Sequence, residues 1–420
     1  IAGTDSAVEA YFHHHGVVRV DQFETLLEMP NLLLGRKPRP GNRVSVITTT
    51  GGGGGMAVDR LGVAGLTAAP LPGDAIKRIE AEGGMVSNGP LLDLTYKGAT
   101  TENTDRVLNE VMKSEETDAA VMVVGSSAQF NPEVSVRSLV KFAGQAKPIG
   151  GFLVPEAAES GRMLTEAGVP CFRTPESCAD AMRAFLSWHK PKPKPSKAAI
   201  DMAPVRAALG LEGMRTLDEQ QCRTVFSKLG IRQVAAAFVK TVSAASKAGD
   251  AVGFPCVAKV VSRDILHKTE AGGVLLNINT QKQLANGLKV MQDRIARDMP
   301  EVKIDGYLVQ SMERGLAEVL VGYRLDELVG PTVVLSAGGV LAEIYGDAAV
   351  RLAPVNRATA FEMINEVRGL APIRGYRGMP KGDLDAIADA LVALSQLAFI
   401  KRPKLTEAEI NPLIVMTEGQ

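Results

Sequence analysis

Residues 254–273 read Phe254-Pro-Cys-Val-Ala-Lys-Val-Val-Ser-Arg-Asp-Ile-Leu-His-Lys-Thr-Glu-Ala-Gly-Gly273, and this stretch decides the fold of the C-terminal half. Apolar runs over 255–261 and 273–278 predict two strands, and His267 lies in the polar turn between them. Lysine and backbone N–H groups can hold phosphate, and neutral imidazole is a nucleophile near neutral pH. The turn therefore suits phosphate handling, although a surface hairpin with an incidental histidine accounts for the same residues.

The segments around this turn indicate an α+β domain over residues 201–420. The strands are grouped, a pattern typical of helices segregated to one side of a sheet. The expected strands are 306–310, 318–323, 332–336 and 405–415, and the expected helices are 218–229, 242–252, 281–297, 358–367 and 384–398.

Polar residues on or beside these strands form a candidate ligand site. Lys259 lies in an apolar run, where it is either a phosphate ligand or an edge-strand lysine that points to water. Residues 309–312 end a strand and offer backbone groups to an adenine edge, and 335–343 form a glycine turn followed by an acid. Glu409 and Asn411 alternate on one strand face and offer two oxygen ligands to Mg²⁺. Exposed polar residues without a ligand explain each segment equally well.

Residues 190–197, Lys-Pro-Lys-Pro-Lys-Pro-Ser-Lys, separate this domain from the N-terminal half. Alternating Lys-Pro favours stiff polyproline II geometry, so we expect a linker over 190–200. Residues 41–189 alternate strands with helices, which predicts a flavodoxin-like, doubly wound parallel sheet and an α/β class for this half. The expected strands are 43–48, 118–124, 148–154 and 170–173, and the expected helices are 56–65, 103–113, 134–142, 157–167 and 177–188.

Two loops of this sheet predict contact with an anion. The glycine run 51–55 follows the first strand, so Gly51, Gly52 and Gly53 can bring N–H groups together at the positive end of a helix dipole. The small polar turn 125–132 follows another strand, and ligands of doubly wound sheets bind beyond such strand ends. A tight turn without a ligand explains either loop as well.

Composition excludes several classes of protein. Lys+Arg and Asp+Glu both number 47, so neither nucleic acid nor an anionic membrane surface is an expected partner. The four cysteines lack CxxC spacing, which fits a reducing cytoplasm, and no apolar run is long enough to predict a membrane span. The histidine triplet 13–15 indicates solvated helix surface, because adjacent residues of a helix point in different directions.

Four segments of the C-terminal half resemble the signature of the NDP-forming acyl-CoA synthetases, the ADP-forming acetyl-CoA synthetase group related to succinyl-CoA synthetase. They are 254–274, 330–347 (GPTVVLSAGGVLAEIYGD), 351–354 (RLAP) and 409–413 (EINPL). In the N-terminal half, 43–65 resembles the family's strand–Gly-Gly–helix opening of a ligase-CoA domain. Residues 88–94 and 124–127 are similar to bacterial members, including feruloyl-CoA synthetase-like proteins.

The resemblance implies an ATP-grasp fold after the linker. His267 would carry a phosphoryl group from ATP, Lys259 would bind the ATP phosphates, and Glu409 with Asn411 would bind Mg²⁺. The implied reaction joins a small carboxylic acid to CoA at the expense of ATP, with an acyl-phosphate intermediate, in an enzyme expected to be a homo-oligomer. Other implied nucleotide-site residues are Val309, Gln310 and Met312 at the adenine hinge, together with Glu318, Gly338, Gly339 and Glu343.

Two departures from the family pattern lead us to expect a fragment of a longer protein. The family begins with a CoA-binding domain and a ligase domain that ends in a first phosphorylated histidine, and neither precedes Ile1. We therefore expect residues 1–40 to be the helical tail of a preceding ligase domain. The family also continues past its Asn-Pro strand to an aspartate that ligates Mg²⁺. The alternatives are a different ATP-grasp carboxylate ligase and a nucleotide-binding regulatory module.

Overall fold

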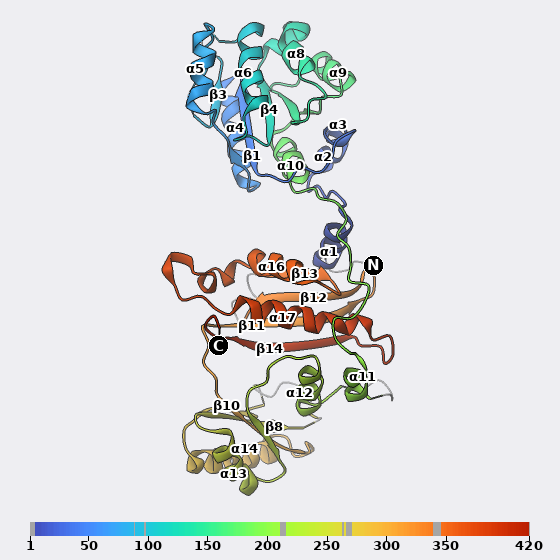
Figure 1. Ribbon diagram of the computed structural model, residues 1–420, viewed down its shortest axis with the longest axis vertical. Coiled ribbons are helices and arrows are strands. Elements are labelled where there is room, and N and C mark those ends of the chain that lie inside the picture. The colour runs from blue at the N-terminus through green and yellow to red at the C-terminus, as the bar shows by residue number, and fades with distance from the viewer. Residues whose placement is uncertain are drawn as a thin grey trace. The chain divides into compact units, whose positions relative to one another are not determined.

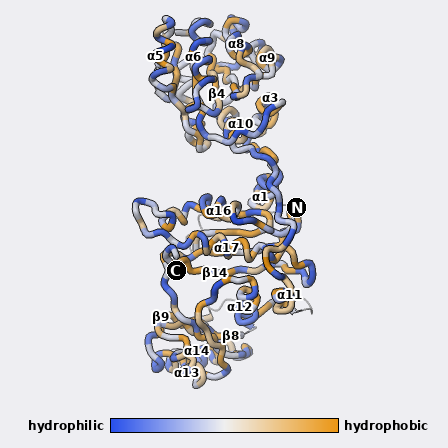
Figure 2. Tube along the Cα trace, viewed as in Figure 1, coloured by the Kyte–Doolittle hydropathy of each residue, from blue (hydrophilic) through white to orange (hydrophobic). Residues whose placement is uncertain are grey.

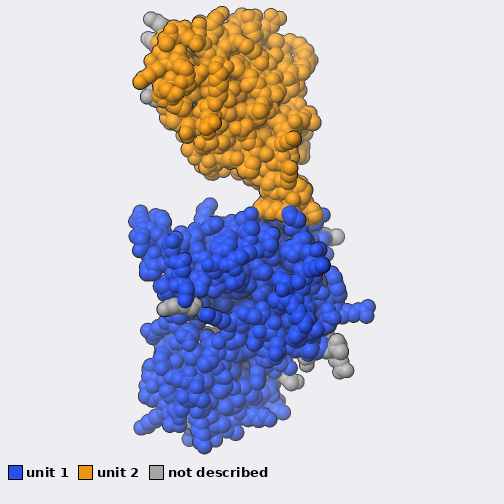
Figure 3. Space-filling view, viewed as in Figure 1, with its two compact units in different colours: residues 1–11, 193–420 blue, residues 12–192 orange. Residues whose placement is uncertain are grey.

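The computed structural model describes residues 5–87, 89–95, 98–210, 216–262, 264–265, 271–338 and 346–419. The chain forms two compact units, shown in different colours in Figure 3. Residues 12–192 form the parallel-sheet unit, and residues 1–11 with 193–420 form the two-sheet unit. The chain therefore passes between the units twice. The domain boundaries expected at residues 40, 189 and 200 stay predictions.

The parallel-sheet unit contains one six-stranded sheet, sheet A (Figure 1). Its order is β2–β1–β4–β5–β6, every pair is parallel, and β3 also pairs with β1. Since β2 and β3 share one position beside β1, this is the flavodoxin-like order, and the predicted doubly wound fold is confirmed. The strands are β1 Arg43–Thr48, β2 Thr67–Ala68, β3 Leu91–Asp93, β4 Ala119–Val124, β5 Ile149–Leu153 and β6 Cys171–Phe172.

Helices cover both faces of sheet A, so its central strands contribute apolar residues to a core on each side. Figure 2 colours the chain by the hydropathy of its residues. All six residues of β4 are buried, which explains its unbroken apolar run. One face packs against α4 (Gly51–Val63) and α10 (Pro175–Leu186). The other face packs against α5 (Gly73–Ala81), α6 (Thr101–Lys113), α8 (Pro132–Lys141) and α9 (Ala158–Glu166).

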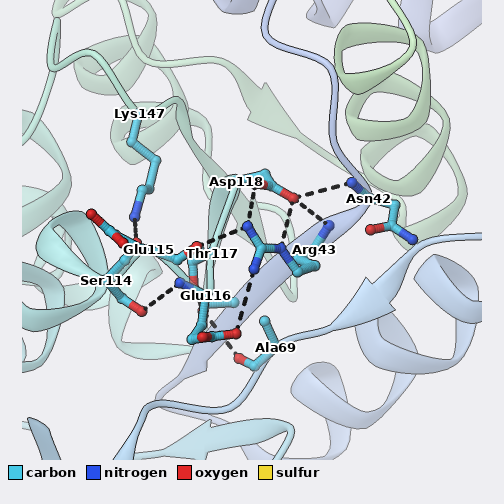
Figure 4. Close-up of polar contacts among 10 residues, drawn as sticks. Asn42, Arg43, Ala69, Ser114, Glu115, Glu116, Thr117, Asp118 and Lys147 are labelled. Carbon is cyan, nitrogen blue, oxygen red and sulfur yellow. Dashed lines mark hydrogen bonds and ion pairs between the residues drawn. The ribbon is translucent and has the colours of Figure 1, made fainter.

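Charged groups join β1 and β4 at their amino ends (Figure 4). Asp118 accepts the backbone N–H of Arg43 at 3.0 Å and pairs with its guanidinium at 2.9 Å. The hydrogen bond from Arg43 is the main cause that lowers the pKa of Asp118 to about 2. Nearby, Lys147 is buried and donates to the carbonyls of Val111 and Ser114 at 2.7 and 2.6 Å. Burial is the main cause that lowers the pKa of Lys147 to about 8.

The N-terminal arm consists of three short helices. Carboxylates hold it on α10, because Asp180 accepts two backbone N–H groups of the turn before the second helix. Glu28 also pairs with Arg173 at 2.7 Å. From residue 12 onward, the arm is therefore part of the parallel-sheet unit. The helices are α1 Asp5–His15, α2 Phe23–Glu28 and α3 Pro30–Leu33.

The two-sheet unit contains two antiparallel, four-stranded sheets, which confirms the predicted α+β class. Sheet B has the order β7–β10–β8–β9, and sheet C has the order β13–β12–β11–β14. Sheet B consists of β7 Ala236–Val239, β8 Cys256–Val261, β9 Val274–Ile278 and β10 Gly306–Ser311. Sheet C consists of β11 Ala317–Asp326, β12 Gly330–Ala337, β13 Ala348–Leu352 and β14 Glu407–Val415.

Each of these sheets packs one face against its helices. In β8, Ala258 and Val260 pack against the helices of sheet B, so Lys259 lies on the opposite face. In β11, Val319 and Val321 belong to the core under the helices of sheet C, so Glu318 lies on the opposite face. The helices are α13 Val242–Val252 and α14 Gln281–Asp298 for sheet B, and α11 Ala203–Leu209, α12 Glu219–Lys228, α16 Arg357–Glu366 and α17 Leu384–Ser395 for sheet C.

Some elements differ from the sequence prediction. Helix α4 begins at Gly51 rather than Met56, so the glycine run forms the first turns of the helix instead of a loop before it. Glycine disfavours helix, and the packing of α4 on sheet A overrides that propensity. The sequence pattern also misses β2, β3, β7 and β13, which have five residues or fewer and therefore little periodicity.

Two structural classes find no support in the described part of the chain. No helix there has both the length and the apolar character needed to cross a bilayer. The four cysteines are Cys171, Cys178, Cys222 and Cys256, and each is a free thiol. Within each unit, the apolar cores described above stabilise the fold.

The Asp118 carboxylate predicts a pH-dependent stability. Its folded pKa lies below the ordinary value, so its contribution is fully present above about pH 4 and is lost as the pH falls toward about 2. We expect Asp118→Asn to lower the free energy of unfolding at pH 7 by roughly 1–2 kcal/mol and to remove this acid slope. Urea unfolding followed by the fluorescence of Trp188, the one tryptophan of the chain, measures this in the parallel-sheet unit.

The control is Glu116→Gln, because Glu116 contacts the same arginine from a side chain that is 68% exposed. We expect this variant to change stability by less than about 0.5 kcal/mol. Equal losses in the two variants would contradict the assignment of the effect to Asp118.

Candidate functional site

Lys259 lies on an internal strand and reaches a carboxylate from another element. Strand β8 lies between β10 and β9, so the interpretation of Lys259 as an edge-strand lysine is wrong. Its Nζ donates to Oε1 of Glu219 at 2.9 Å, and the two side chains are 29% and 21% exposed. Glu219 is in the first turn of α12, which a capping box at Asp218 begins. A half-buried cation is thus presented on the opposite face of sheet B, where phosphate oxygens have the right charge to replace the carboxylate.

The predicted adenine hinge is the end of β10. Val309 faces the helices of sheet B and is fully buried, whereas Gln310 lies on the Lys259 face and is 8% exposed. The N–H groups of Ser311 and Met312 donate to backbone carbonyls at 2.9 Å, so they are engaged within the chain. The roles of Val309, Gln310 and Met312 stay predictions.

The face of sheet C that is not packed against helices carries the predicted oxygen ligands of Mg²⁺. Glu409 pairs with Gly322 of β11, four residues beyond Glu318, which puts Glu318 and Glu409 roughly 13 Å apart along the strand. Asn411 is exposed and lies in a bulge of β14 opposite Leu320. Among the described residues, no cluster of three or more His, Cys, Asp or Glu side chains is arranged to hold a metal ion. The metal-binding role of Glu409 and Asn411 stays a prediction.

Gly338 allows a close backbone contact. Its N–H donates to the carbonyl of Glu318 at 2.7 Å, and a Cβ at this position would lie 2.6 Å from the same oxygen. Glycine is required here by packing, whatever ligand lies nearby. The predicted residues His267, Gly339 and Glu343 lie outside the described residues.

A cavity of about 420 Å³ opens at the carboxyl edge of sheet A. Thr49, Thr50 and Gly51 after β1 line it, as do Gly125 and Ser126 after β4. The chain leaves β1 toward α4 on one face and leaves β4 toward α8 on the other, so the cavity lies at the topological switch point. The two loops that the sequence marks as anion turns thus meet at one cavity.

The glycines of α4 have different reasons to be glycine. A Cβ on Gly53 would lie 2.5 Å from Cγ1 of Val154, and one on Gly54 would lie 2.7 Å from Cδ1 of Leu91. A Cβ on Gly52 would meet no atom within 4 Å. No side chain caps the helix at Thr50, so the first-turn N–H groups, including that of Gly51, remain available to an anion.

The sequence pattern does not predict that residues of helices α6 and α8 line the cavity. Thr104 on α6 and Ser138 on α8 are 4% and 3% exposed and both line the cavity. The available signal was the pair Ser135 and Ser138, three residues apart on α8, which breaks the apolar side of that helix. Cys171 offers no competing nucleophile, because burial raises the pKa of its thiol to about 12.

A family model of the ATP-grasp domain matches residues 209–420, half of the chain. The β subunit of an ADP-forming acetate–CoA ligase I from Pyrococcus furiosus is 30% identical over 49% of this chain and 88% of its own length. The chain belongs to the ATP-grasp family of ADP-forming acyl-CoA ligases. The resemblance drawn from residues 254–274 and the other segments is thereby confirmed.

Two longer relatives match both units of this chain. The ADP-forming acetate–CoA ligase I of Archaeoglobus fulgidus is 30% identical over the whole chain and 61% of its own length. The ADP-forming 4-hydroxybutyrate–CoA ligase of Nitrosopumilus maritimus is 24% identical with the same coverage. This chain thus spans about three fifths of these relatives. A solved acetyl-CoA synthetase chain from Ca. Korarchaeum cryptofilum, determined with coenzyme A and Ca-AMPCP, is 30% identical over 48% of this chain and 88% of its own length, with a TM-score of 0.46.

The glycines of α4 give a matched pair of variants. We expect Gly53→Ala to lower the free energy of unfolding by about 1–3 kcal/mol, because its Cβ overlaps Val154. We expect Gly52→Ala to be neutral or to stabilise by up to about 1 kcal/mol, because its Cβ has room and alanine favours helix. Urea unfolding followed by Trp188 fluorescence separates the two; similar losses in both variants would contradict the packing account.

Proposed function

We propose that this chain is the nucleotide-binding and phosphoryl-accepting part of an ADP-forming acyl-CoA synthetase. The reaction converts a carboxylic acid, CoA and ATP into acyl-CoA, ADP and phosphate through an acyl-phosphate and a phosphohistidine. The observation that carries the proposal is the match to an ADP-forming acetate–CoA ligase over both units, at 30% identity. Two lone domains shared by chance would not keep this order over the whole chain.

In this proposal, ATP lies between the faces of sheets B and C that are not packed against helices. Lys259 binds the phosphates, and Gln310 and the end of β10 lie beside the adenine base. Glu409 and Asn411 hold Mg²⁺ together with the phosphate oxygens, and the metal neutralises charge that develops during transfer. The ion pair of Lys259 with Glu219 supports this, because the lysine already pairs with one anionic group.

The cavity of sheet A is the second binding site in this proposal. We assign to it the anionic end of the acyl substrate or its phosphoryl group, held by the N–H groups of Gly51, Gly52 and Gly53 and by the surrounding hydroxyls. His267 is the nucleophile that accepts the phosphoryl group and carries it between the ATP site and this cavity. We assign the binding of CoA and the remaining catalytic residues to the part of the relatives that this chain does not span.

The setting of the enzyme is also part of the proposal. We propose a cytoplasmic homo-oligomer without nucleic-acid or membrane partners. The balance of 47 basic and 47 acidic residues supports the absence of a polyanionic partner, and four free thiols fit a reducing compartment.

The Lys259–Glu219 pair makes a signed prediction for nucleotide affinity. Glu219 occupies the lysine that ATP must use, so we expect Glu219→Gln to tighten ATP binding by roughly threefold to tenfold. We expect Lys259→Met to weaken it by more than about tenfold. Isothermal titration of the full chain with Mg-ATP measures both, and Glu301→Gln, at an exposed site, is the charge control. Weaker binding in Glu219→Gln would show instead that Glu219 supports the lysine.

The phosphohistidine step makes a second prediction. We expect the full-length protein to take an acid-labile, base-stable label from ATP labelled at the γ-phosphate, and His267→Ala to abolish that label. Release of ADP with CoA and a panel of carboxylic acids then reports the complete reaction. Activity that persists in His267→Ala would favour another type of ATP-grasp ligase. ATP binding with neither label nor ADP release would favour a regulatory module.

A further inference from the structure

The N-terminal arm exposes a group of large apolar side chains. Among the described residues, eight such side chains are at least 60% exposed, and four of the eight lie within residues 23–34. These four are Phe23, Leu26, Leu27 and Leu34, with exposed fractions of 70%, 60%, 61% and 71%. Single exposed apolar side chains are normal on a protein surface, whereas a group of this density marks an interaction site.

Helix α2 is apolar on two faces. On the inner face, Thr25 is fully buried, and Met29 belongs to the core that includes α10. Phe23, Leu26 and Leu27 have the spacing i, i+3 and i+4, so they share the outer face of the helix. A helix that is apolar all round is normally buried all round. The outer face therefore calls for a partner that the described part of the chain does not supply.

The arm holds this outer face in a fixed position beside α10 (Figure 1). Asp180 on α10 accepts two backbone N–H groups of the turn before α2, at 2.8 and 3.0 Å. At the end of α2, Glu28 accepts the hydroxyl of Ser177 at 2.7 Å. The side-chain amide of Asn31 donates to the carbonyl of Thr165 at 3.2 Å. A surface anchored in this way loses little conformational entropy when a partner binds.

The size of this surface fits one half of an interface. At these exposures, the four side chains offer on the order of 300–400 Å² of apolar surface. A specific interface buries about 800 Å² on each partner, and about 60% of that area is apolar. The four side chains therefore supply most of the apolar part of one such interface.

The charges beside the outer face suit the pairing of two arms. Between residues 23 and 40, the acidic residues Glu24 and Glu28 come first, and the basic residues Arg36, Lys37 and Arg39 follow. Glu24, Lys37 and Arg39 are exposed. When a two-fold axis relates two arms, their α2 helices run antiparallel, so the acidic end of each arm meets the basic end of the other. A partner with a single sign of charge would match only one end.

We propose that the outer face of α2 is the surface at which two copies of this chain pair about a two-fold axis. Phe23, Leu26 and Leu27 form its apolar centre, and Glu24 of each copy lies beside Lys37 of the other copy. The inference rests on the homo-oligomer of the proposed function and names its surface. It does not depend on the proposed reaction.

The first test measures the mass of the full chain by sedimentation equilibrium. We expect wild type to form a dimer, and the double variant Phe23→Gln with Leu27→Gln to raise the dissociation constant by about tenfold or more. Both positions are exposed and glutamine favours helix, so the fold should be unchanged. The control is Val63→Gln, which replaces a 78% exposed apolar side chain at the end of α4 and should leave the dimer intact.

The second test exchanges charges. We expect Glu24→Lys to weaken the dimer by about threefold or more, because it places a lysine beside the basic end of the other arm. Adding Lys37→Glu to the same chain should restore the wild-type dissociation constant. Restoration within one chain is expected only when the arm pairs with a second copy of itself.

Three results would overturn the inference: a monomeric wild type, a dimer that the two glutamines leave intact, and a charge exchange that restores nothing. A dimer that survives the two glutamines would remove this surface and keep the proposed homo-oligomer. The label from ATP on His267 reports the proposed reaction independently of both.

Discussion

The burial of sheet faces constrains where this protein can place chemistry. Sheet A is covered on both faces, and the six residues of β4 are all buried and apolar, so this central strand offers no polar side chain to a ligand. The cavity that a ligand could enter lies at the carboxyl ends of the strands. Sheets B and C each use one face for a helix-packed core, which leaves the other face for Lys259, Glu318 and Glu409.

The two ends of sheet A have separate duties. The amino end is a structural clamp in which Asp118 holds Arg43, and Lys147 caps two carbonyls. The carboxyl end has the cavity, the uncapped start of α4 and a lining rich in serine and threonine. The paired charges and the hydroxyl-lined cavity thus occur at opposite ends of the same strands.

A feature can be predicted from the sequence when the residues that create it are close together along the chain. The strand of Lys259 and the apolar run of β4 are local patterns, and both were correctly read as strands. The partner of Lys259 is forty residues away, on a helix of another core, and no spacing indicates it. The start of α4 was placed at Met56 because glycine disfavours helix, yet Gly53 and Gly54 are needed for close packing on Val154 and Leu91. Ser138 escaped notice because its environment is created by the approach of α6 to α8.

The place of the linker has a consequence for gene architecture. The six strands of sheet A all come before the Lys-Pro segment, and the eight strands of sheets B and C all follow it. Some relatives of this chain are separate β subunits of about half its length. A gene divided at the Lys-Pro segment would therefore give two polypeptides with complete sheets, and neither would need a strand from the other.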